Sequence, residues 1–463
     1  MVGIRMVVVA FAAGLALCAM AADIEIDFET ATGKIKPVHS VGQGPLLGID
    51  DYSMFKYLKE ANVPYARLHD VGGRFGGNVF VDIPNLFRDF DADENDPANY
   101  DFTFTDRYLK ALVENGVEPY FRLGVTIEVF ARTVKAYRIF PPKDYAKWAR
   151  ICEHVIRHYT EGWADGFKYK IAYWEIWNEP DDFPDNRNAM WRGSWRDFCE
   201  LYEVASKHLK ATFPHLKIGG YGKCTANSAL VMYGDEPPEE DAYRHKCFVE
   251  FCDFIKERKC PLDFFSFHAY IQPDHVRSHV DYHRGILRKA GYGDVELHLN
   301  EWLSREWLSR DKSRSYYHNE ALACATAAFI VAAQTADLQM ANIYDARCRP
   351  GTYCPLFDPA TKQPGKAFYA LKYFGELYRL GTAVKCVVVC GIQGHGGLWA
   401  VAAKGEDGAA ALVVNDSPGS RPFTFDFGGR KVKRCRIVDA SRTDEEVDFP
   451  SVLPPASFML VEF

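Results

Sequence analysis

Eight short apolar segments, each followed by an amphipathic one, recur along most of this chain. The short segments are rich in Val, Ile, Phe and Tyr and have the length of buried β-strands. They run from Val38 to Val41, Pro64 to Leu68, Pro119 to Leu123, Ile171 to Trp177, Lys217 to Tyr221, Phe264 to Tyr270, Val295 to Asn300 and Ala341 to Tyr344. Helices are expected from Tyr52 to Ala61, Thr105 to Asn115, Pro142 to Tyr159, Trp195 to Ala211, Lys246 to Lys259, Tyr282 to Ala290, Asn319 to Ala336 and Lys366 to Leu380. Eight such units predict an α/β fold, a closed (β/α)8 TIM barrel rather than an open doubly wound sheet.

An open sheet that binds a dinucleotide would carry a Gly-x-Gly-x-x-Gly turn after an early strand. The run from Gly72 to Gly77 lacks that spacing.

His154 and His158 lie four apart on a predicted helix, but no glutamate stands between them to complete a metalloprotease motif. The sequence therefore implies no cofactor and no metal site.

After Leu380 the helical period disappears and short β-like runs alternate with turn residues. We expect residues 23–380 to form the barrel domain and residues 381–463 to form a small antiparallel β-sandwich. Residues 23–30, where Ile24 and Ile26 alternate with acidic residues, are candidates for an additional edge strand of that sandwich.

Residues 1–22 have the pattern of a signal peptide. Arg5 precedes an apolar run from Met6 to Leu17, and Ala19-Met20-Ala21 supplies the small residues of a cleavage site. An uncleaved anchor fits less well because the run is short for a bilayer, and Leu17 before Cys18 argues against lipoprotein processing. We therefore expect a secreted or periplasmic protein without an integral membrane segment after cleavage.

The charge balance bears on possible partners. The chain has a formal charge of -7 and an isoelectric point near 6.1, so it lacks the basic surface that nucleic acids require. An exported chain with 13 cysteines allows disulfides, for example between Cys348 and Cys354 or between Cys386 and Cys390. Many of the cysteines also stand in apolar surroundings, as small core residues do, so the sequence leaves the pairing open.

Two glutamates follow the ends of predicted strands, in Asn178-Glu179-Pro180 and Asn300-Glu301-Trp302. The carboxyl ends of barrel strands carry the chemistry of TIM barrels. The glutamates are 301 − 179 = 122 residues apart, which matches three strand and helix units of about 40 residues. Barrel closure would bring them face to face, and an acid paired with a carboxylate is what glycosidic bond cleavage requires.

The run from Tyr173 to Asp181 (YWEIWNEPD), with Leu299-Asn300-Glu301-Trp302, resembles the clan A glycoside hydrolases, and the whole layout is similar to glycoside hydrolase family 39. That family includes β-xylosidases and α-L-iduronidases and uses a retaining double displacement. The resemblance implies that Glu179 is the acid/base, that Glu301 is the nucleophile, and that Asn178 hydrogen-bonds the sugar 2-hydroxyl. The implied partner is an oligosaccharide or another glycoside.

Further site candidates come from neighbouring strand ends. Arg67 and His69 share one strand face, and either could keep Glu301 ionised. Ser266, His268 and Tyr270 also share a face, and the resemblance places His268 and Tyr270 in the sugar site. Many clan members carry a Trp platform on the last strand, and Tyr344 is the substitute candidate here.

Glu175 is expected to be a buried structural partner of a barrel arginine. Glu306, which repeats Glu301 in the duplicated segment EWLSR, is expected at the surface.

The sugar is left open by the sequence. An iduronidase needs a cation for the substrate carboxylate, for which Arg74, Arg122 and Arg347 are candidates, whereas a xylosidase excludes a C5 substituent. Galactosidase or arabinosidase activity is also compatible with the chain. A non-catalytic carbohydrate-binding barrel is the alternative from another class, although it would not need paired carboxylates.

Overall fold

The computed structural model describes residues 23–45, 47, 54–71, 81–127, 138–185, 187–225, 238–304, 307–308, 316–351, 353–388 and 397–463. Several expectations lie outside these residues. They concern the signal peptide at 1–22, the run from Gly72 to Gly77 with Arg74, the duplicate Glu306, and Cys390.

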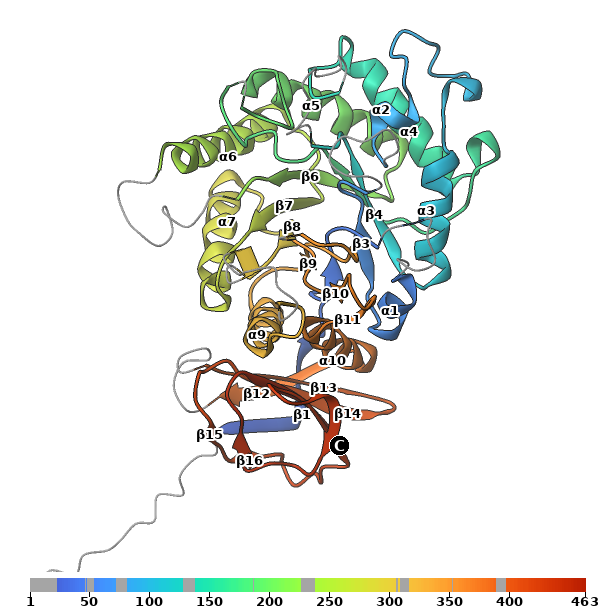
Figure 1. Ribbon diagram of the computed structural model, residues 1–463. Coiled ribbons are helices and arrows are strands. Elements are labelled where there is room, and N and C mark those ends of the chain that lie inside the picture. The colour runs from blue at the N-terminus through green and yellow to red at the C-terminus, as the bar shows by residue number, and fades with distance from the viewer. Residues whose placement is uncertain are drawn as a thin grey trace, which may run out of the picture.

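Eight parallel strands close into a barrel in chain order (Figure 1). They are β2 (Ser40–Val41), β3 (Tyr65–Arg67), β4 (Glu118–Leu123), β5 (Tyr173–Ile176), β6 (Lys217–Lys223), β7 (Phe264–Ala269), β8 (Glu296–Trp302) and β9 (Met340–Ile343). Each overlaps one of the eight predicted strands, and β9 pairs with β2 to complete the ring. The predicted (β/α)8 barrel is confirmed.

Helices surround the barrel. They are α1 (Phe55–Glu60), α2 (Ile83–Leu86), α3 (Thr103–Glu114), α4 (Tyr145–Thr160), α5 (Trp195–Thr212), α6 (Glu239–Arg258), α7 (Val276–Ala290), α9 (Glu320–Thr335) and α10 (Lys366–Leu380). Local sequence explains several ends, since Ser194 and Asp197 form a reciprocal capping box that starts α5. The helix α6 begins seven residues before the predicted Lys246, because Glu239 and Glu240 favour a helix N-terminus electrostatically although they carry no apolar period.

The C-terminal part forms a separate, mainly antiparallel domain below the barrel in Figure 1. Its eight-stranded sheet has the order β16-β1-β12-β13-β14-β20-β17-β18, and β15 pairs with β19 beside it. The strands are β1 (Ile24–Lys34), β12 (Thr382–Val388), β13 (Leu398–Gly405), β14 (Gly408–Asn415), β15 (Arg421–Pro422), β16 (Phe425–Asp426), β17 (Arg434–Val438), β18 (Thr443–Val447), β19 (Val452–Leu453) and β20 (Ser457–Glu462). The candidate strand at residues 23–30 does join this sheet. It lies inside the edge rather than on it, because the short β16 pairs in parallel with its outer side.

One face of this sheet packs against the barrel through α9 and α10. The helix α9 is rich in alanine and buried on all sides, as expected for a helix between two layers. Phe458 and Leu412 of the sheet belong to the same apolar core as the barrel, and the Phe458 ring meets Tyr373 of α10 edge to face. The opposite face of the sheet has its own apolar core, which includes Ile24, Ile26 and Met459. The N-terminal strand thus belongs structurally to the C-terminal domain.

The barrel interior is unusually aromatic and polar. Tyr120, Phe264 and Met340 form a small apolar cluster inside it, where aliphatic side chains dominate in most TIM barrels. Nearer the amino ends of the strands, the Tyr173 hydroxyl donates to Glu296, whose carboxylate also contacts Lys217 and His298. These bonds satisfy polar groups that would be costly to bury alone.

The cysteines among the described residues, Cys348 and Cys354 included, are free thiols, and most are buried.

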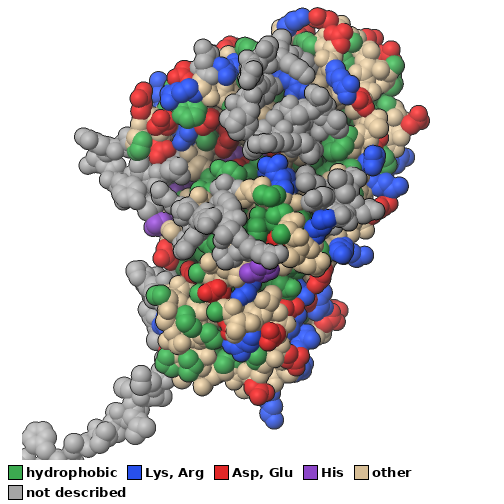
Figure 2. Space-filling view, viewed as in Figure 1, with side chains coloured by type: hydrophobic (Ala, Val, Ile, Leu, Met, Phe, Trp, Pro, Cys, Tyr) green, Lys and Arg blue, Asp and Glu red, His purple; other side chains and the backbone are tan. Residues whose placement is uncertain are grey.

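None of the helices in the described part of the chain combines the length and apolar character needed to cross a bilayer. Figure 2 shows Lys and Arg side chains interspersed with Asp and Glu on the visible face.

Replacing Phe458 with alanine is expected to lower the free energy of unfolding by about 3 to 5 kcal/mol, because it opens a cavity in the core shared by both domains. Chemical denaturation followed by tryptophan fluorescence measures this loss. The control is Val452→Ala on β19, where the side chain is exposed. If both variants lost the same small amount, the domain contact would not stabilise the molecule.

Candidate active site

The turn after β5 presents Glu179 to the cleft at the carboxyl ends of the barrel strands. Trp177 and Glu179 both adopt left-handed backbone conformations, with φ of 73° and 45°, which cost energy in residues other than glycine. The surrounding structure holds this turn, since Glu179 N–H donates to Gly222 at 2.9 Å and the Trp177 indole donates to Met190 at 3.0 Å. Such strain is typical of functional sites.

A bulge in β8 presents Glu301. His298 and Leu299 pair in register with β7, but the register then shifts so that His268 lies opposite Glu301 and Asn300 is the extra residue. Regular alternation would send Asn300 and Glu301 to opposite faces of the strand. The bulge instead allows both side chains to make contacts on the barrel's inner side.

The two glutamates meet across this cleft. One carboxylate oxygen of Glu179, one of Glu301 and a ring nitrogen of His268 all lie within 4.8 Å of one another. His268 Nδ1 is 2.7 Å from Glu179 Oε1 and 3.7 Å from Glu301 Oε2. The Glu179 side chain is 17% exposed and that of Glu301 7%, so a ligand entering the cleft can reach both.

Both oxygens of Glu301 already have donors. Arg67 Nη1 donates to Oε2 at 3.3 Å, and the Tyr270 hydroxyl donates to Oε1 in a short hydrogen bond. The three clustered side chains are close enough to resemble metal ligands, but a cation would have to displace this guanidinium and hydroxyl. The arrangement favours an ionised Glu301 that is stabilised by the protein itself.

Arg67 connects three parts of the site. Its Nε donates to Glu175 at 2.7 Å, its Nη1 to Glu301, and its Nη2 to the Asn178 side-chain oxygen. The guanidinium is fully buried, so each of these bonds fixes a side chain in a medium of low polarity. The amide nitrogen of Asn178 has no hydrogen-bond partner among the described residues, which leaves it available to a ligand.

Glu175 is the buried anchor of this network. Its other oxygen accepts from the Ser266 hydroxyl and the Asn300 amide, both at 2.6 Å. The expectation that it partners a barrel arginine agrees with the contact to Arg67. The sequence shows only that Ser266 and Asn300 lie on strands. Their shared partner, Glu175, is far away in the sequence and is brought next to them by barrel closure.

The two carboxyl groups differ in their surroundings. Burial raises the pKa of Glu179 to about 7, and the nearby Asp182 charge adds to this effect, while Arg244 and Arg67 oppose it. Burial also raises the pKa of Glu301, but Arg67 and the Tyr270 hydroxyl stabilise its ionised form. Burial lowers the pKa of His268 to about 4, so this ring is neutral near pH 7.

Two other candidates lie near the site without a contact to either glutamate among the described residues. His69 Nε2 lies 3.6 Å from Asp70 Oδ2, and the imidazole ring faces the Tyr344 ring. No hydrogen bond joins His69 to Glu301 among the described residues. Tyr344 is 5% exposed and packs against Tyr353. Tyr353, which also contacts the Tyr270 ring, was not expected, because no motif in its loop singles it out.

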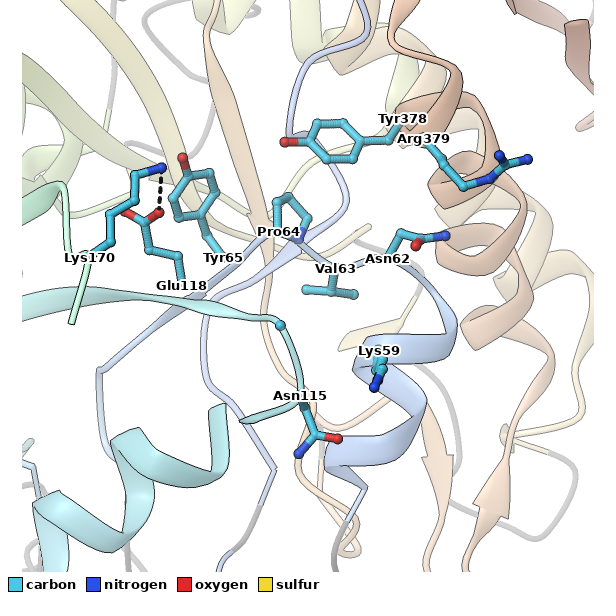
Figure 3. A pocket seen from close by; sticks show the side chains of 11 residues that line it. Lys59, Asn62, Val63, Pro64, Tyr65, Asn115, Glu118, Lys170, Tyr378 and Arg379 are labelled. Atoms are coloured by element: carbon cyan, nitrogen blue, oxygen red, sulfur yellow. Dashed lines mark ion pairs between the residues drawn. The ribbon is translucent and has the colours of Figure 1, made fainter. Parts of the chain in front are cut away.

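A separate hollow of about 560 Å³ lies at the opposite end of the barrel (Figure 3). It is formed by residues that precede or begin β3 and β4, such as Tyr65, and by the end of α10, which contributes Tyr378. An ion pair of 3.4 Å between Lys170 and Glu118 stands at its side. Functional groups of TIM barrels gather at the other end, so this hollow is distinct from the glutamate cleft.

Comparisons with known proteins show what this chain is similar to. The β-xylosidase of Geobacillus stearothermophilus is 24% identical over 259 residues, which cover 50% of this chain and 47% of the relative. The α-L-iduronidase of Homo sapiens is 34% identical over 127 residues, covering 27% of this chain and 18% of the relative. A glucosidase structure from Croceicoccus marinus superposes with a TM-score of 0.72 at 20% identity, covering 95% of this chain and 98% of that one. This last likeness concerns the fold.

The chain spans about half the length of the β-xylosidases it matches. The sequence model described as Glycosyl hydrolases family 39 matches residues 22–295, which is more than half of the chain and includes Glu179. The chain therefore belongs to glycosyl hydrolases family 39.

Proposed function

We propose that the protein is an exported, retaining glycoside hydrolase that removes terminal sugar units from oligo- or polysaccharides, in the manner of a β-xylosidase. Glu179 is the acid/base and Glu301 the nucleophile. Family membership supports hydrolysis of a glycosidic bond, and the proposed export rests on the signal-like pattern of residues 1–22.

The observation that carries the retaining mechanism is the closeness of the two carboxylates. Oxygens of Glu179 and Glu301 lie within 4.8 Å of each other. Retaining enzymes keep their carboxyl groups about 5 to 5.5 Å apart, whereas inverting enzymes need about 6.5 to 9.5 Å to admit a water molecule between acid and base. The spacing leaves room for direct attack on the sugar.

The charge states suit the two roles. A protonated Glu179 can give its proton to the leaving oxygen, while Arg67 and Tyr270 keep Glu301 ionised for attack at the anomeric carbon. The glycosidic C–O bond then breaks and an ester to Glu301 forms. Glu179, now ionised, takes a proton from water, whose oxygen bonds the anomeric carbon and releases the carboxylate of Glu301.

Asn178 completes the site. Its side-chain oxygen is fixed by Arg67, and its amide nitrogen is unpartnered among the described residues. In the proposed reaction this nitrogen donates to the sugar 2-hydroxyl, a bond that strengthens as the transition state forms.

The β-xylosidase assignment rests on the curated relatives and on the contacts of Arg347, one of the arginines that could bind the carboxylate of an acidic sugar. The Arg347 guanidinium is buried and bonded to Asp345, so its charge is already neutralised within the protein. One nitrogen of Arg347, Nη1, and the three guanidinium nitrogens of the buried Arg122 have no hydrogen-bond partner among the described residues, so Arg122 carries the less compensated charge of the two. The iduronidase-like alternative would depend on Arg122 or on Arg74, which lies outside the described residues.

A carbohydrate-binding barrel without catalysis is the rival from another class. A binding barrel would also need the aromatic side chains. It would not need two neighbouring carboxylates held by hydrogen-bond donors, because burying these groups costs desolvation energy. The experiments below separate the two readings.

Replacing Glu179 with alanine is expected to lower kcat about 10²- to 10⁴-fold on an activated aryl xyloside. Replacing Glu301 is expected to cost about 10⁴-fold or more, because no covalent intermediate can form. Azide should rescue both variants. The glycosyl azide should keep the substrate's anomeric configuration with Glu179→Ala and have the opposite one with Glu301→Ala.

The matched control is Glu114→Ala on α3, whose side chain is exposed and far along the chain from both strand ends. It should hydrolyse the xyloside like the wild type. A wild type that binds glycosides but turns over none in a panel of aryl glycosides would support the binding barrel instead.

The pH dependence of kcat/KM is expected to be bell-shaped. Glu179 must be protonated, so activity is lost as the pH rises through about 7. Glu301 must be ionised, so activity is lost at low pH, and burial places this limb above the ordinary glutamate range. Initial rates on an aryl xyloside measure the profile. A flat profile from about pH 4 to 9 would contradict the assignment of the pair.

Retention can be observed directly. The first sugar released from a β-xyloside should be the β-anomer, which later equilibrates to the mixture, because two displacements restore the original configuration. Proton NMR of the anomeric region during the first minutes follows this. Initial formation of the α-anomer would mean inversion, and the direct role of Glu301 would be excluded.

A further inference from the structure

A second charged cluster lies directly beside Glu179. The backbone N–H of Asp182 donates to the carbonyl of Glu179 at 3.3 Å, which ties the two residues into one turn. The Cys224 thiol, at the end of β6, donates to the Asp182 carboxylate at 3.4 Å. The backbone N–H of Cys224 donates to Asp181 at 2.9 Å. Two adjacent strand ends are thus joined next to the glutamate.

Arg244 of α6 holds this cluster from the outside. Its Nη2 donates to the Asp182 carboxylate at 2.9 Å and to the Asp182 carbonyl at 3.1 Å. Its Nη1 donates to the carbonyl of Thr225 at 2.9 Å and to Asp241 at 3.3 Å. One largely buried guanidinium therefore fixes both the backbone and the side chain of Asp182.

Charged and titratable groups face Glu179 from several sides. Asp182 and Asp181 lie on its own loop, and the other groups come from neighbouring elements: Arg67 (β3), Lys223 (β6), Cys224 (after β6), Arg244 (α6), His268 (β7), Tyr270 (after β7), Glu301 (β8) and Tyr353 (after β9). Among the opposing cations, Arg67 is bonded to Glu301 and Lys223 to a carbonyl. Among these groups, Asp182 is the carboxylate that both Arg244 and the Cys224 thiol contact.

We infer that Asp182, held beside Glu179 by Arg244 and Cys224, is a positioning residue for the acid/base function of Glu179. This inference rests on the proposed acid/base role of Glu179. The reaction needs a proton on Glu179 while the adjacent Glu301 carries a charge. Burial raises the pKa of Asp182 itself, but Arg244 and the Cys224 thiol oppose this and favour the ionised carboxylate, whose charge beside Glu179 supplies part of that difference. In the proposed reaction Asp182 has no chemical step of its own and acts only through Glu179.

The neutral variant Asp182→Asn tests the charge. It removes the carboxylate that raises the pKa of Glu179 and leaves Arg244, which lowers that pKa. A group with a lower pKa loses its proton at lower pH, so the basic limb of kcat/KM should move down by about one pH unit. The acidic limb, which reports Glu301, should move less.

The variant Cys224→Ala should act in the opposite direction. The thiol lowers the pKa of both Glu179 and Asp182, so its removal should move the basic limb to higher pH. A merely destabilised loop would not shift the limb in opposite directions in two variants of the same cluster. Arg196→Gln, which breaks an exposed ion pair with Glu200 on α5, is the matched control and should leave the profile unchanged.

Direct titration separates this inference from the proposed function. In protein labelled with ¹³C only at glutamate carboxyls, the signal lost in Glu179→Gln identifies Glu179, and the neighbouring aspartates do not appear. Its midpoint should be near pH 7 in the wild type, lower in Asp182→Asn and higher in Cys224→Ala. Unchanged midpoints in both variants would overturn the inference even if the enzyme is active. Shifted midpoints in a protein that hydrolyses no glycoside would support the inference and refute the proposed reaction.

Discussion

The buried guanidinium of Arg67 is the contact on which the site depends. It bridges Glu175 deep in the barrel, Asn178 after β5 and Glu301 on β8, so three strand ends share one rigid donor. A buried cation without partners would be very costly, and a buried carboxylate equally so. Together they are stable only in the closed barrel. Closing the barrel therefore also places the carboxylates that Arg67 binds, Glu175 and Glu301.

The fold was largely predictable because its signals are local. Apolar segments and helical periods each lie within ten to twenty residues, and a count of eight units leads to barrel closure. From closure, the meeting of Glu179 and Glu301 follows without further information. The helix ends were less predictable: α6 starts with charged residues whose benefit comes from the helix dipole and not from burial.

The details of the site could not be predicted for a physical reason. Alternation of faces assumes a regular strand, but the turn at Trp177 and Glu179 is left-handed and β8 carries an extra residue at Asn300. Strand alternation made Arg67 and His69 equal candidates for binding Glu301. In the described part of the chain, Glu301 is bonded to Arg67 and not to His69. Arg244 reaches the site from a helix with no motif, so only tertiary structure reveals it.

The position of β1 has a consequence for how the molecule is made. This strand leaves the ribosome before the barrel does, yet its partner β12 begins only at Thr382. At about 5 to 20 residues per second, synthesis of the intervening barrel takes some tens of seconds. During that time an apolar strand must wait with an open hydrogen-bonding edge. The barrel between them, by folding first, brings β1 and β12 together and acts as a template for the sheet that they share.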